Sequence, residues 1–136
     1  MNQIRNFIEK SKIWKFDRRT FIDNKLHGFI NQGTIEWHQE SDNNYIYHEI
    51  GELIINNESV KFDYALLFKF SGNDYQVFTS GDKLLYKSNI NNKAYNKIDN
   101  FNIEVELKVI DDNKITFKFD KYNNEESKID ITNYYI

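Results

Sequence analysis

The chain has 136 residues, a net charge of −3 and no cysteine. This length predicts a single domain over residues 1–136, and the missing cysteines exclude disulfides, thiolate metal sites and cysteine nucleophiles. Basic residues are interleaved with acidic ones, which argues against a nucleic-acid partner and against an anionic lipid surface. The first twelve residues hold no apolar signal segment, and no apolar run has the length of a membrane span. We therefore expect a cytoplasmic protein with no membrane span.

Residues 2–11 are predicted to form a short helix. Ile4, Phe7 and Ile8 follow one another at spacings of three and four residues, so a helix places them on one face. From Ile13 onward the apolar period changes to two, which is the period of a strand. The helix is expected to flank or plug one end of a β-structure that spans residues 13–136.

The first half of that structure is predicted to hold four strands, at about 13–22, 26–38, 45–53 and 60–70. Gly33 lies inside the second strand and predicts a bulge or a sharp bend. Along each strand, alternate residues share one face. The members of these faces are Trp14, Phe16, Arg18, Thr20 and Ile22; His27, Phe29, Gly33, Ile35 and Trp37; Tyr45, Tyr47, Glu49, Gly51 and Leu53; and Val60, Phe62, Tyr64, Leu66, Phe68 and Phe70.

The second half continues the pattern. Short strands are predicted at 75–79 and 83–88, a polar, Asn-rich loop at 88–97, and further strands at 101–109, 115–119 and 129–135. Nine or ten strands with short connections form a meander, and a meander of this size closes to remove its edges. The predicted fold class is all-β, a single antiparallel up-and-down β-barrel with a short N-terminal helix. A barrel of this size can enclose one small ligand.

Several motifs resemble those of an uncharacterised, mostly bacterial domain family of unknown function. Its W-x-F-x-R pattern is matched from Trp14 to Arg18, its G-T by Gly33 and Thr34, and its Y-x-E-x-G-x-L from Tyr47 to Leu53. A closing T-x-Y is matched from Thr132 to Tyr134. The resemblance implies a lipocalin-like, or calycin, barrel, and it implies no particular activity.

Four candidate ligand-binding residues come from two strand faces, Trp14 with Arg18 and Tyr47 with Glu49. If both faces point inward, Arg18 and Glu49 form an ion pair among aromatic rings, because a buried charge needs a partner. Such a pair either anchors the polar head of a ligand or closes the barrel structurally. Tyr64 is the fifth candidate, since the aromatic stripe on its strand reads either as core packing or as the wall of a pocket.

The remaining polar residues predict no catalytic residue, no metal site and no cofactor. The spacing of His27, His38 and His48 matches no metal motif, so we interpret them as surface or rim residues. The leading hypothesis is a barrel that binds a small apolar or amphipathic ligand. One alternative is an isomerase, lyase or hydrolase that acts through Tyr47, His48 or Glu49. The other is a protein–protein interaction module with a filled barrel.

Overall fold

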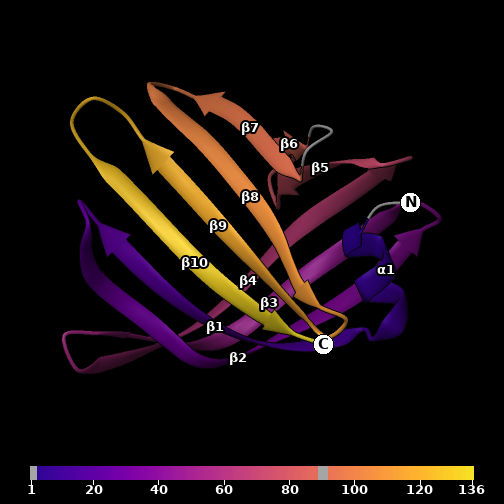
Figure 1. The fold of residues 1–136 in the computed structure, drawn as a ribbon, viewed down its shortest axis with the longest axis horizontal. Helices are drawn as coiled ribbons and strands as arrows, with labels where there is room; N and C mark the ends of the chain where they lie inside the picture. Colours follow the sequence, from indigo (N-terminus) through magenta and orange to yellow (C-terminus); the bar gives the residue numbers. More distant parts are fainter. Residues whose placement is uncertain (1–2, 89–91) are drawn as a thin grey trace.

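The computed structural model describes residues 3–88 and 92–136. Over these residues the chain forms one short helix and ten antiparallel strands that close into a single barrel in sequence order, with β1 pairing β10 (Figure 1). The predicted up-and-down barrel is thus confirmed. The elements are α1 (Gln3–Lys10), β1 (Ile13–Ile22), β2 (Lys25–Ser41), β3 (Asn44–Ile55), β4 (Glu58–Ser71), β5 (Asp74–Thr79), β6 (Leu84–Ser88), β7 (Lys93–Ile98), β8 (Phe101–Asp111), β9 (Lys114–Tyr122) and β10 (Ser127–Tyr135).

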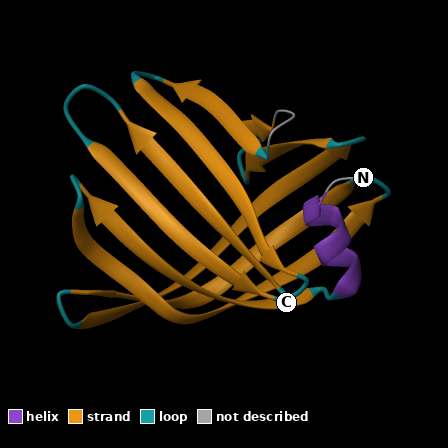
Figure 2. Ribbon diagram, in the orientation of Figure 1, coloured by secondary structure: helices purple, strands orange, loops and turns teal. Residues whose placement is uncertain are grey.

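Helix α1 lies across one end of the barrel (Figure 2). Its predicted apolar face is buried, with Ile4 and Ile8 at 1% and 0% exposure. Two basic side chains tie the helix to the turns at this end, where Arg5 donates to Asn43 at 2.9 Å and Lys10 donates to the carbonyl of Asp112 at 2.8 Å. The helix therefore closes this end of the barrel with apolar side chains. Among the residues that the structure describes, no helix is long and apolar enough to cross a membrane.

Strand β2 contains the bulge that Gly33 predicts, and the bulge reverses which residues face inward. Phe16 pairs with Gly33 but Arg18 pairs with Ile30, so Asn31 and Gln32 together lie opposite one residue of β1. Gly33, Ile35 and Trp37 share one face as predicted, and this face is buried. The prediction was wrong for His27, which is exposed, and for Phe29, which lies on the outer side; their places inside are taken by Gly28 and Ile30. An unbroken alternation across the bulge caused this error.

Gly33 is required by the close approach of an aromatic ring. A Cβ atom at this position would lie 2.0 Å from Cε1 of Phe16, which is far inside van der Waals contact. The Phe16 ring therefore packs against the bare backbone of β2. The Cζ atom of Arg18 lies 5.0 Å from the centroid of this ring, which is a cation–π distance. Gly33 thus leaves room for the Phe16 ring, which in turn contacts Arg18.

The prediction of a loop over residues 88–97 was wrong for its second half. Residues 93–98 form β7, which pairs with β6 and β8, while residues 89–91 lie outside the described part of the chain. Polar Asn96 occupies an alternate position along this strand between Ala94 and Ile98, so the apolar period was hidden. Its Nδ2 donates to the carbonyls of Leu84 and Leu85, both at 3.0 Å, which explains the amide in a strand.

Candidate ligand-binding cavity

The barrel encloses a cavity of about 450 Å³. This volume lies in the range of small-molecule sites, which is roughly 300–1,000 Å³. All five residues that the sequence singles out line this one cavity: Trp14, Arg18, Tyr47, Glu49 and Tyr64. Trp14 shares a face with Arg18, and Tyr47 with Glu49, as the alternation predicts, and both faces point inward; the ligand-binding role of the five residues stays a prediction. The rest of the wall is mainly apolar and aromatic, with Ile4, Trp37, Leu66, Phe68, Leu85, Tyr86, Ile98, Ile103, Val105, Phe117, Phe119 and Tyr134, and it also includes Lys121, Lys128, Asp130 and Thr132.

A network of charge-assisted hydrogen bonds centres on Arg18 and Glu49. Arg18 donates from both terminal nitrogens to the two carboxylate oxygens of Glu49, at 2.5 and 2.7 Å, and its Nε donates to Oγ1 of Thr132 at 2.7 Å. Tyr47 donates to Glu49, and the Tyr47 and Tyr134 hydroxyls lie 2.9 Å apart. The Glu49 side chain is only 2% exposed, so its charge depends on these donors rather than on water.

The network shifts the pKa values of its members. Burial opposes the charge of Arg18, but the hydrogen bonds and the negative charge of Glu49 outweigh it and hold the pKa of Arg18 well above its usual value. Burial first, and then the neighbouring Tyr134 and Glu49, raise the pKa of Tyr47 well above its usual value. Burial raises the pKa of Tyr134 to about 12, although Arg18 counteracts it. Both phenols are therefore protonated near neutral pH and serve as hydrogen-bond donors.

The cavity changes in polarity along the barrel axis. At the end under α1, the rings of Trp14 and Trp37 meet edge to face with centroids 5.1 Å apart. The Arg18–Glu49 pair lies farther along the same strands. Tyr64, cross-strand partner of Glu49, comes at the same level and is 44% exposed. Lys128 is exposed and still lines the cavity, so the cavity reaches solvent at the end away from α1.

Sequence reasoning missed two members of the network, Thr132 and Tyr134, as site residues. They belong to the closing strand β10, where Thr132 pairs with Arg18 and Tyr134 with Phe16. The alternation of Thr132 and Tyr134 was visible, but only closure of the barrel brings the two ends of the chain together. Trp37 was also missed. Its buried indole Nε1 has no hydrogen-bond partner among the residues that the structure describes.

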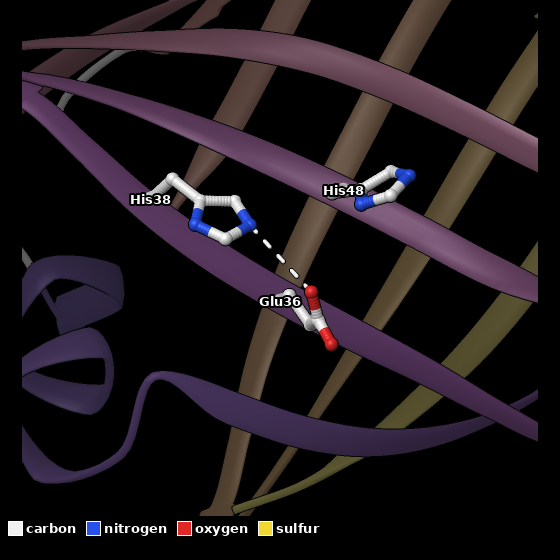
Figure 3. A group of neighbouring side chains, drawn as sticks. All are labelled: Glu36, His38 and His48. Carbon is white, nitrogen blue, oxygen red and sulfur yellow. Dashed lines mark ion pairs between the residues drawn. The ribbon is translucent and has the colours of Figure 1, made fainter.

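The three histidines lie outside the cavity wall. His48 is on the outer side of β3, where its Nε2 lies 2.5 Å from Oδ1 of Asp63. His38 is exposed on β2, with Nε2 3.6 Å from Oε2 of Glu36. Figure 3 shows Glu36, His38 and His48 next to one another on β2 and β3. His27 does not belong to this group. The interpretation as surface residues agrees with these positions, but the proximity of His38 to His48 was not anticipated.

No family model matches the chain, and no curated protein matches it either. The resemblance to an uncharacterised bacterial family thus stays a prediction. Among solved structures, the chain is similar to the S-type phycobiliprotein lyase CPES from Guillardia theta, with a TM-score of 0.62 and 9% sequence identity. The match covers 99% of this chain and 92% of the lyase chain. At this identity the similarity shows a shared barrel fold.

Proposed function

We propose that the protein binds one small amphipathic molecule inside the barrel. The observation that carries this proposal is the cavity of about 450 Å³, which has an aromatic wall and one buried, hydrogen-bonded ion pair. Ligand sites commonly combine a mostly apolar wall with a few fixed polar groups that orient the ligand. The similarity in fold to a protein named as a phycobiliprotein lyase agrees with a barrel that holds a small molecule.

The polar head of the ligand is expected at Arg18. A guanidinium has five N–H donors; three donate to Glu49 and Thr132, and Tyr134 is a further hydrogen-bond partner of Arg18, which leaves one N–H group for a ligand. The charged residues of the cavity wall are three cations and two carboxylates, in a chain whose net charge is −3. This local excess of positive charge favours a head group that accepts hydrogen bonds, such as a carboxylate, a sulfonate or a carbonyl.

The apolar body of the ligand is expected against the aromatic rings. Trp14 and Trp37 form the wall at the closed end, where a planar or branched apolar group can pack on their rings. The unpartnered Nε1 of Trp37 would gain a hydrogen bond from an acceptor atom in that body. Tyr64 stands at the solvent side and would cover the ligand once it is seated.

The alternative is an enzyme in the same pocket that acts through Tyr47, His48 or Glu49. His48 lies on the outer side of β3 and is absent from the cavity wall, so an acid–base pair of His48 with Glu49 on one bound molecule does not fit. Of the residues named for this alternative, Tyr47 and Glu49 line the cavity. The other alternative, a protein–protein interaction module, assumes a barrel filled with side chains. This barrel instead has a cavity of about 450 Å³.

The proposal can be tested with 1-anilinonaphthalene-8-sulfonate, which has an aromatic body and an anionic head. The chain has two tryptophans, and both line the cavity, so a probe in the barrel should receive excitation energy from them. We expect saturable binding of one probe per chain, measured as energy transfer from tryptophan. Binding should be competed by other small amphiphiles.

Two matched variants separate the cavity from the outer surface. Ile103→Phe adds a ring to the cavity wall, whereas Ile110→Phe makes the same exchange on the same strand at a position that is 46% exposed. The first variant should weaken probe binding at least about tenfold, since the larger ring projects into the space that the probe would occupy. The second should leave binding unchanged. Equal affinity in both variants, with both folded by circular dichroism, would place the probe on the surface and contradict the proposal.

A further inference from the structure

A second cluster of side chains with binding chemistry lies on the outside of the barrel. Glu36 and His38 are two residues apart on β2, so both point away from the interior, as Trp37 between them points inward. His48 is the direct cross-strand partner of Glu36 on β3. Figure 3 shows the three side chains in front of these strands, with the far wall of the barrel behind them.

We propose that Glu36, His38 and His48 bind one divalent cation of the first transition row, with Zn²⁺ as the representative ion. One ligand atom from each residue lies within 4.8 Å of the other two. A tetrahedral zinc ion with bonds of about 2.05 Å holds its ligand atoms about 3.4 Å apart. Nε2 of His38 and Oε2 of Glu36 are already 3.6 Å apart, so modest side-chain rotations complete the site.

Asp63 gives this cluster the orienting contact that metal-binding histidines use. Asp63 lies on β4, the strand next to β3, and its Oδ1 is 2.5 Å from Nε2 of His48. A proton on Nε2 that is donated to this carboxylate leaves the lone pair of Nδ1 for the metal. Figure 3 shows one ring nitrogen of His48 on the side of Glu36. The carboxylate thus fixes both the tautomer and the direction of the ring.

The donor set indicates the class of cation. Two imidazoles and one carboxylate suit zinc, copper, nickel or iron(II), whereas magnesium and calcium prefer oxygen ligands. Three protein ligands leave at least one coordination position for water. The side chains of His38 and Glu36 are 59% and 41% exposed, so an ion reaches the site directly from solvent. The site is separate from the cavity, because none of its three residues lines the cavity.

The test is calorimetric titration of untagged, chelator-treated protein with ZnCl₂, together with imidazole nitrogen shifts by nuclear magnetic resonance. We expect one zinc ion per chain, with shifts at His38 and His48. His38→Ala and His48→Ala should each weaken binding at least about tenfold, and Asp63→Asn should weaken it roughly tenfold through the orientation of His48. His27→Ala is the matched control, because His27 is exposed on the same strand outside the cluster, and it should change nothing.

Three results would overturn the proposal. The first is the absence of saturable binding of one ion per chain. The second is full affinity in either His38→Ala or His48→Ala, since the site requires both imidazoles. The third is an equal loss in His27→Ala, which would indicate scattered surface binding. The cavity variant Ile103→Phe should keep normal zinc affinity, so failure of this site and failure of the ligand cavity are distinguishable.

Discussion

Replacing Arg18 with methionine tests whether the ion pair in the cavity is as buried as its geometry indicates. Methionine keeps much of the length of the side chain but removes the positive charge and all three hydrogen bonds to Glu49 and Thr132. The Glu49 carboxylate is then left with Tyr47 as its remaining side-chain donor in the network. An unpaired charge in this environment should destabilise the fold strongly.

The expected loss follows from the burial of both partners. Breaking a buried ion pair by removing one partner costs about 3–5 kcal/mol. The Arg18 side chain is 18% exposed, so some water can reach the vacated space, which favours the lower end, about 3 kcal/mol. With a urea dependence of roughly 1–3 kcal/mol per molar, the midpoint of unfolding should fall by about 1–3 M. Urea titration monitored by tryptophan fluorescence measures this directly, since Trp14 and Trp37 lie in the same cavity.

A second substitution distinguishes an unpaired charge from lost packing. In the double variant Arg18→Met, Glu49→Gln, neither position of the pair carries a charge, and the amide oxygen of the new side chain can still accept from Tyr47. Its stability should return to within about 1 kcal/mol of the parent protein, because neutral replacement of a buried pair is close to neutral in free energy. Two results would contradict a buried ion pair. One is a stability loss below about 1 kcal/mol in Arg18→Met alone, and the other is a loss in the double variant equal to the sum of the losses in the two single variants.

Two further predictions concern packing and pH. Gly33→Ala should lower the free energy of unfolding by about 1–3 kcal/mol, because the added Cβ would overlap the Phe16 ring. Gly81→Ala is the control and should be nearly neutral, since the nearest neighbour of its Cβ is 4.0 Å away. Similar thermal midpoints of the two variants would contradict this prediction. Because the pKa of Tyr134 is raised to about 12 in the fold and is about 10 when unfolded, its contribution is full below pH 10 and is lost as the pH rises to about 12. Between pH 10 and pH 12, the free energy of unfolding measured by urea titration should fall by about 3 kcal/mol less in Tyr134→Phe than in the parent protein. An equal fall in both proteins would contradict the raised pKa of Tyr134.

The sequence predicts the barrel well because strict alternation is a local signal. Along β1 and β3 the period alone predicts which residues share a face, so Arg18 is grouped with Trp14 and Glu49 with Tyr47 before any pairing is known. The distance between them is not local. Arg18 on β1 and Glu49 on β3 are separated by β2, so their ion pair spans this strand. The bulge in β2 and the packing of Phe16 on Gly33 lie beneath the pair and are not visible in the alternation.

The missed features depend on contacts between distant segments. Tyr134 joins the network because β10 pairs with β1, which follows from barrel closure rather than from any motif. His38 and His48 become neighbours through the register of β2 against β3, and a shift of one residue in one strand would separate them. Asn96 hid a strand because its amide caps two carbonyls of β6, a role that composition does not reveal.

Native mass spectrometry of freshly purified protein, compared with the denatured mass, shows whether the barrel holds a ligand. We expect the parent protein to carry, or to take up from added amphiphile, the mass of one small molecule per chain, and to lose this mass on denaturation. Ile103→Phe should lose this excess mass and Ile110→Phe should keep it. A parent protein that stays free of ligand in the presence of amphiphile, or an excess mass that Ile103→Phe retains in full, would contradict a ligand-binding barrel.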